Sequence, residues 1–117
     1  MSDNSALLHD LEKLVRRNTA LISAGGIPRL MRSGVRYQRE PKGREEWLDC
    51  TEVLRARVGD CEDLACWLAG ELRANGDHRA RAVLKLVRPG LKHCLVMDGR
   101  GNLRDPSRAL GMGKRHR

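Results

Sequence analysis

The residues best suited to chemistry lie in the stretch GDCEDLA, at residues 59–65, where a cysteine stands at the expected start of a helix. Asp60 is a favourable N-cap, and Asp63 three residues later can complete a capping box. Cys61 would then lie in the first turn, among backbone N–H groups that no helical carbonyl accepts. Because those donors and the helix dipole favour negative charge, we expect this position to stabilise a thiolate. Cys61 is therefore the candidate nucleophile.

A histidine and an aspartate later in the chain could activate that thiol. His93 lies in a predicted strand at residues 92–97, and Asp105 ends a short predicted strand at 102–105 that follows the hairpin sequence DGRG. If the loop has three residues centred on Gly99, His93 and Asp105 are direct cross-strand neighbours on one face; another loop length would shift the pairing. The carboxylate would orient the imidazole, which would take the thiol proton. We predict a Cys61–His93–Asp105 triad with the Cys61 backbone N–H as oxyanion donor.

Each of these residues also has an ordinary structural role. A cysteine on an inward helix face commonly packs in a core, and a histidine in a strand is commonly held by structural hydrogen bonds. An aspartate before proline is a common turn residue. Only the combination of all three indicates catalysis. His78, in a loop, and His116, in the basic C-terminal tail, are weaker candidate bases.

The remaining cysteines do not have the spacing of a metal site. Cys61 and Cys66 are five residues apart and diverge by about 140° on a helix, while His93 and Cys94 face opposite ways on a strand. We therefore predict no metal and no cofactor, and we interpret Cys66 and Cys94, like Cys50, as core thiols.

The elements that must position the triad follow from the periodicity of apolar residues. The order of elements predicts an α+β fold in which helices, including the nucleophile helix, pack on one side of a small antiparallel sheet. The chain is short enough to be a single domain over residues 1–117. Its predicted parts are an N-terminal helix at 4–23 within a segment 1–26, a core at 35–110 and a basic flexible tail at 111–117. Within the core we predict an extended segment at 35–37, a helix or turns at 45–57, the Cys61 helix to residue 75, and strands at 79–87, 92–97 and 102–105.

The composition limits the classes of partner. The formal net charge is +8, which suits either an acidic partner or nucleic acid. However, the aromatic residues are only Tyr37, Trp47 and Trp67, too few for a surface that stacks bases, and this argues against nucleic acid. No apolar run approaches the roughly 18 residues that span a bilayer. The N-terminus lacks the features of a signal peptide, and four irregularly spaced cysteines suggest free thiols, so we expect a cytoplasmic protein without membrane contact.

Three motifs in order resemble the transglutaminase-like superfamily of cysteine enzymes, and most closely the small single-domain versions encoded by bacteriophages and prophages. They are GDCEDLA at 59–65, the histidine at 93 in a strand and DPSR at 105–108. The resemblance covers residues 35–112, including the segment at 40–47. It implies a papain-related fold with Cys61 as nucleophile, His93 as general base and Asp105 as orienting acid. It also implies a side-chain oxyanion donor, for which Gln38, Tyr37 and Trp47 are candidates.

The resemblance implies acyl transfer from an amide of a protein or peptide substrate. We expect a phage-associated cysteine peptidase or amidase, acting in the host cytoplasm or associated with the virion. The alternatives are cross-linking by a transglutaminase, and a catalytically silent structural or adaptor protein on the same scaffold that binds virion proteins or an acidic partner surface. A basic nucleic-acid binder is the third hypothesis.

Overall fold

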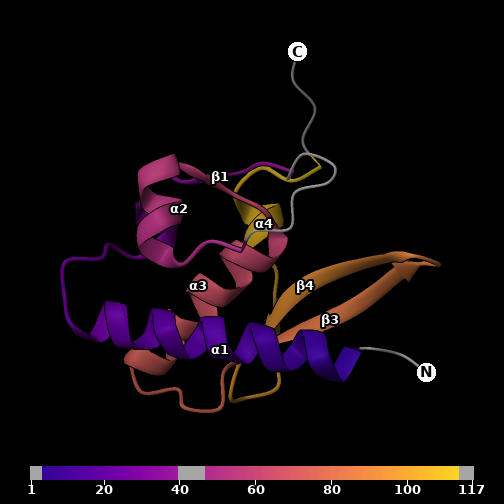
Figure 1. Ribbon diagram of the computed structural model, residues 1–117, viewed down its shortest axis with the longest axis horizontal. Helices are drawn as coiled ribbons and strands as arrows, with labels where there is room; N and C mark the ends of the chain where they lie inside the picture. Colours follow the sequence, from indigo (N-terminus) through magenta and orange to yellow (C-terminus); the bar gives the residue numbers. More distant parts are fainter. Residues whose placement is uncertain (1–3, 40–46, 114–117) are drawn as a thin grey trace.

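The computed structural model describes residues 4–39 and 47–113 of the 117-residue chain. Its helices lie mainly in the first two thirds of the sequence, and an antiparallel meander follows (Figure 1). In chain order the elements are α1 (Asn4–Ser23), the 3-10 helix η1 (Leu30–Arg32), β1 (Arg36–Tyr37), α2 (Cys50–Ala56), β2 (Val58–Gly59), α3 (Cys61–Ala74), β3 (Arg81–Arg88), β4 (Leu91–Met97), β5 (Leu103–Arg104) and α4 (Pro106–Ala109).

Helix α3 runs through the centre of the molecule, with α1 across one end and α2, β1 and α4 at the other (Figure 1). All nine residues from 63 to 71 are buried, and Trp67 is the largest fully buried side chain. A Cβ at Gly70 would lie 2.8 Å from the Cβ of Asn18 on α1, so this glycine lets the two helices approach closely. The packing holds α3, and with it the position of Cys61 at its first residue, from several sides.

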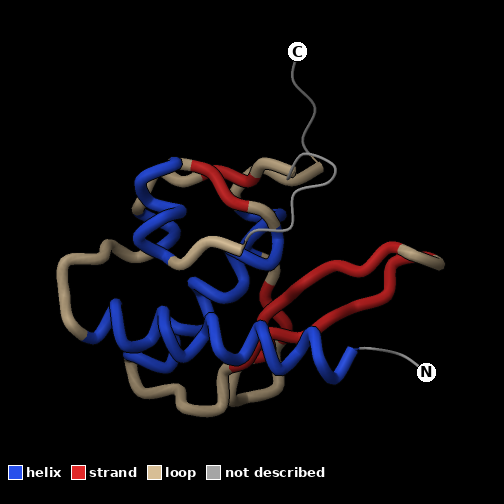
Figure 2. The backbone as a smooth tube through the Cα atoms, viewed as in Figure 1, coloured by secondary structure: helices blue, strands red, loops and turns tan. Residues whose placement is uncertain are grey.

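The three-stranded antiparallel sheet has a packed base and an exposed tip. At the base, Ala82, Cys94 and Val96 belong to the buried core. Beyond it the β3–β4 hairpin projects away from the helices (Figure 2) and turns at Gly90, whose φ of 78° suits glycine. We call residues 85–92 the hairpin tip. Burial therefore fixes the strands near His93 and leaves the tip in solvent.

A second, two-stranded sheet joins segments that are distant in the sequence. β1 and β2 run parallel, with Tyr37 opposite Gly59. The Gln38 N–H donates to the Gly59 carbonyl at 2.9 Å, and the Tyr37 N–H donates to the Leu110 carbonyl at 2.9 Å. Because Gly59 is two residues before Cys61, this pairing places Tyr37 beside the start of α3.

The α+β class predicted from the sequence is confirmed: helices combine with a small antiparallel sheet. α1 has the predicted bounds, and α3 ends at Ala74 with Asn75 as its C-cap. β3 begins two residues later than predicted, at Arg81. Three elements were not predicted: η1, β2 and α4. Pro106, which follows the last strand, is the first residue of α4, where its missing N–H costs no helical hydrogen bond.

Some predictions fall partly outside the described residues. Of the segment 40–47, the structure describes only Trp47, and of the tail 111–117 it describes residues 111–113, which form a turn. Among the described helices, none combines the length and apolarity that a membrane span requires.

Candidate functional site

The start of α3 has the capping geometry that the sequence predicts. The Asp63 N–H donates to the Asp60 carboxylate at 3.0 Å, and the Asp60 N–H donates to the Asp63 carboxylate at 3.2 Å, which completes a capping box. A Cβ at Gly59 would meet atoms of Val53, Asp63 and Leu64 at 3.2 Å each. A glycine before the cap therefore leaves room for close packing, and a larger residue would require these neighbours to shift. Together these contacts fix the turn that carries Cys61.

His93 and Asp105 form the predicted pair. His93 Nε2 lies 3.1 Å from both carboxylate oxygens of Asp105, and the two side chains are 13% and 27% exposed. Asp105 is also the N-cap of α4, because its carboxylate accepts from the Arg108 N–H at 3.1 Å. The carboxylate is thus fixed from two sides, and it holds the imidazole through Nε2. Nδ1 remains as the ring nitrogen that can accept a proton.

The register behind this pair differs from the predicted one. Val96 pairs with Arg104 and Met97 with Leu103, so the three-residue loop is centred on Arg100 and not on Gly99. The loop forms this way because the buried Asp98 carboxylate accepts from the N–H groups of residues 100 and 102 at 2.9 Å each, and Gly101 adopts a φ of 86°. His93 and Asp105 are therefore diagonal neighbours, not direct ones. Because a shift of the pairing by two residues leaves each side chain on the same face of the sheet, His93 and Asp105 still come into contact.

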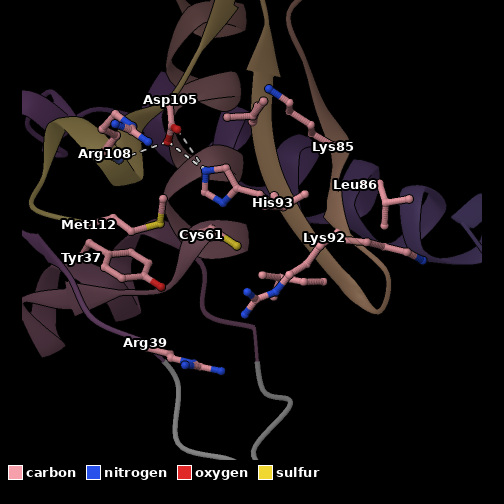
Figure 3. A pocket seen from close by; sticks show the side chains of 14 residues that line it. Tyr37, Arg39, Cys61, Lys85, Leu86, Lys92, His93, Asp105, Arg108 and Met112 are labelled. Atoms are coloured by element: carbon pink, nitrogen blue, oxygen red, sulfur yellow. Dashed lines mark hydrogen bonds and ion pairs between the residues drawn. The ribbon is translucent and has the colours of Figure 1, made fainter.

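Cys61 and His93 line the same cavity. Its volume is about 640 Å³, and its walls come from the start of α3, from β4, from the segment around Asp105 and from β1. Figure 3 shows the Cys61 sulfur and the His93 ring projecting into this space, with Nδ1 on the side of Cys61 and Nε2 on the side of Asp105. The three residues of the predicted triad, which are 12 to 44 positions apart in the sequence, thus converge on one cavity.

The state of the thiol differs from the prediction of a stabilised thiolate. Burial, followed by the negative charge of Glu62, raises the pKa of Cys61 to about 12. The Cys61 Sγ donates to Glu62 Oε1 at 3.4 Å. The carboxylates of Asp60, Glu62 and Asp63 lie in or before the first turn of α3, where they offset the positive end of the helix dipole. In this geometry the sulfur is a thiol at neutral pH.

Three further groups at the site were not identified from the sequence. The backbone N–H of Cys94 lowers the pKa of Cys61 by hydrogen bonding to the sulfur, although burial outweighs it. Glu62 has the opposite effect, because its charge and its hydrogen bond to the thiol both raise the pKa of Cys61. The side chains of the hairpin tip form one wall of the cavity. Glu62 adjoins Cys61 in the sequence and could have been considered there. The other two depend on how the strands pair.

Of the three candidate oxyanion donors, Tyr37 is the one whose side chain lines the cavity (Figure 3). Burial raises its pKa, so its hydroxyl remains a donor at neutral pH. Gln38 is exposed, and Trp47 packs against the core cluster. Met112, in the turn after α4, also lines the cavity.

The weaker candidates do not reach this cavity. His78 is exposed in a loop beside Gly99, and His116 lies outside the described residues. Cys50, Cys66 and Cys94 are fully buried, as expected of core thiols, and burial raises the pKa of each. Within residues 4–39 and 47–113, no three His, Cys, Asp or Glu side chains are grouped to hold a metal ion.

Comparisons with protein-family models, with curated proteins and with solved structures find no match to this chain.

Proposed function

We propose that the chain is a cysteine-dependent acyl-transfer enzyme of the transglutaminase-like type, acting as a peptidase or amidase. The observation that carries the proposal is the arrangement in one cavity of Cys61, the His93 ring and the Asp105 carboxylate that holds Nε2 at 3.1 Å. A metal or a cofactor is not required for this chemistry. The order of the motifs in the sequence supports the same class.

The chemistry follows the positions of the atoms. The Cys61 thiol turns from Glu62 toward His93, its proton passes to Nδ1, and the sulfur attacks the carbonyl carbon of an amide. Because burial and Glu62 favour the thiol, this proton transfer accompanies the attack and is not completed beforehand. The backbone N–H of Cys61 and the Tyr37 hydroxyl are donors for the oxyanion.

Collapse of the tetrahedral intermediate completes the first half-reaction. The carbon–nitrogen bond breaks, the His93 imidazolium gives its proton to the departing amine, and a thioester on Cys61 remains. Asp105 stabilises the imidazolium during both transfers because its carboxylate already accepts from Nε2. Water then attacks the thioester with His93 as base, and this releases an acid and the free thiol. An amine in place of water would give cross-linking.

The test is the trapping of that thioester. The protein is mixed with a library of blocked peptide amides, quenched in acid, and weighed intact by mass spectrometry beside Cys61→Ala and His93→Ala. We expect a mass increase equal to an acyl group on the wild type, absent in Cys61→Ala and reduced at least a hundredfold in rate in His93→Ala. As a control, His78→Ala should behave like the wild type, because His78 is exposed away from the cavity.

Two results would count against the proposal. If an acyl adduct forms on Cys61→Ala at the same rate as on the wild type, the reaction belongs to another residue. Absence of any adduct, together with equal alkylation of Cys61 by iodoacetamide in wild type and His93→Ala, would favour the silent adaptor. Addition of a primary amine separates the remaining alternatives, because a transglutaminase would yield the peptide–amine product at the expense of the acid.

A further inference from the structure

The cavity beside Cys61 carries positive charge that the acyl-transfer chemistry does not require. Among the described residues that line it, one is a carboxylate, Asp105, which already contacts His93. Five are cationic: Arg39, Lys85, Arg88, Lys92 and Arg108. The described walls of the cavity therefore have a clear positive excess, close to the position where a substrate must lie.

Four of these cations are available to a ligand. The side chains of Arg39, Lys85, Arg88 and Arg108 are exposed, and none forms an ion pair with another residue of the described part of the chain. Lys85 is the cross-strand partner of His93, so both side chains leave the hairpin on the same face. Lys85 therefore lies next to the proposed general base on this face of the hairpin.

The wall that the hairpin tip contributes to the cavity also carries apolar side chains. Leu86, Val87 and Leu91 line the cavity and are 63%, 56% and 39% exposed. They are three of the six exposed large hydrophobic residues among the described ones. Exposed apolar groups gathered at a cavity commonly mark a binding surface. The hairpin tip therefore presents cations and apolar side chains together, along a strand that leads to His93.

We infer that this cavity binds an acidic peptide segment, in which Asp or Glu side chains flank the amide that Cys61 attacks and a large apolar residue contacts Leu86 and Val87. Carboxylates complement Lys85, Arg88 and Arg39, and an apolar side chain complements Leu86 and Val87. A nucleic acid fits less well, because the lining has one aromatic residue, Tyr37, for base stacking. The position of the amide rests on the proposed function; the binding of the acidic segment does not.

Binding can be measured without catalysis in the full-length Cys61→Ala protein. The probes are a rhodamine-labelled decapeptide of alternating Glu and Leu, the same peptide with Gln for Glu, and a labelled ten-nucleotide single-stranded DNA. Fluorescence anisotropy gives Kd at low and at physiological ionic strength. The test variant adds Lys85→Gln and Arg88→Gln. The matched control adds Lys13→Gln and Arg55→Gln, which remove one lysine and one arginine from exposed positions on α1 and α2.

We expect the Glu peptide to bind at least about tenfold more tightly than the Gln peptide, with weaker binding at higher salt. The Lys85→Gln/Arg88→Gln variant should lose roughly tenfold in affinity for the Glu peptide, and the control pair less than about twofold. Each of these differences would support the inference at the cavity, whether or not the protein proves to be an enzyme.

Four outcomes would overturn it. They are equal affinity for the Glu and Gln peptides, no saturable binding of the Glu peptide below about 1 mM, an equal loss in the control pair, and tighter binding of the oligonucleotide than of the Glu peptide. The last would assign the basic wall to nucleic acid. If binding behaves as expected and no thioester forms, the proposed function fails while the acidic ligand stands.

Discussion

The base and the tip of the β3–β4 hairpin are parts of the same two strands, yet they have opposite environments. At the base, Cys94 and Val96 are fully buried against the helices, whereas Leu86 and Val87 at the tip are more than half exposed. His93 lies between them, at 13% exposure. One hairpin therefore has two structural roles. Its buried base holds the imidazole in place, and its exposed tip extends the wall of the cavity into solvent.

The sharpest test of this contrast compares one buried and one exposed side chain. Trp67→Ala on α3 should lower the free energy of unfolding by about 3–5 kcal/mol, because Trp67 is fully buried in the core that supports the base. Leu86→Ala at the tip should change it by less than about 0.5 kcal/mol. Urea unfolding followed by circular dichroism measures both. A large loss in Leu86→Ala would mean that the tip is packed in solution.

The second prediction separates the two roles of Asp105, the N-cap of α4 and the partner of His93. Asn is also a good N-cap, so Asp105→Asn should leave the melting temperature nearly unchanged. In the proposed mechanism it removes the charge that stabilises the imidazolium, so the proposed acyl transfer should slow roughly a hundredfold. Kinetics on a peptide amide and a thermal melt of the same sample measure the two effects.

The matched control for that prediction is Asp49→Asn. Asp49 is likewise an N-cap, of α2, and it accepts from Arg17 at 2.8 Å, away from the cavity. Here the stability should fall, because a partly buried ion pair is lost, while the rate of acyl transfer should be retained. Equal losses of rate in the two variants would show that Asp105 acts only through the stability of the fold.

The smallest effect is expected where the α3 helix meets the cavity, at Glu62. Its carboxylate raises the pKa of Cys61 by charge and by accepting from the thiol. Glu62→Gln removes the charge, so the pKa of Cys61 should fall, and at any pH below that pKa the thiolate fraction should rise by up to about tenfold. The pH dependence of iodoacetamide alkylation at Cys61 measures this. Asp10→Asn on α1 is the control, and an unchanged profile in Glu62→Gln would contradict the prediction.

Local signals predicted the elements well, and the errors have physical causes. Asp60, Asp63 and the apolar spacing located α3, because a capping box is a short-range interaction. The parallel pairing of β1 with β2 links residues more than 20 positions apart and covers only two residues of each strand, so periodicity cannot reveal it. The register around Gly101 depended on which N–H groups the Asp98 carboxylate accepts from, a tertiary detail.

At the candidate site, too, some features could be predicted from the sequence and others depend on the tertiary structure. The three residue types and their convergence could be predicted, since a register shift of two residues leaves each side chain on its face. The protonation state of Cys61 could not, because it depends on burial and on the direction of the Glu62 side chain. The basic and apolar lining of the cavity could not be predicted either. Its cations Arg39, Lys85 and Arg108 belong to three separate segments, which only the fold brings together.

The close approach of α1 and α3 at Gly70 has a practical consequence for anyone who trims this protein. Leu11 and Val15 belong to the same buried core cluster as Trp67, and the Asn18 carboxamide accepts from the Cys50 N–H at 2.8 Å. A fragment that starts after residue 26 would therefore expose the apolar surface of α3 that α1 covers, around Cys66 and Gly70. Helix α1 is thus part of the core of this fold, and expression of the shorter piece should yield aggregated material.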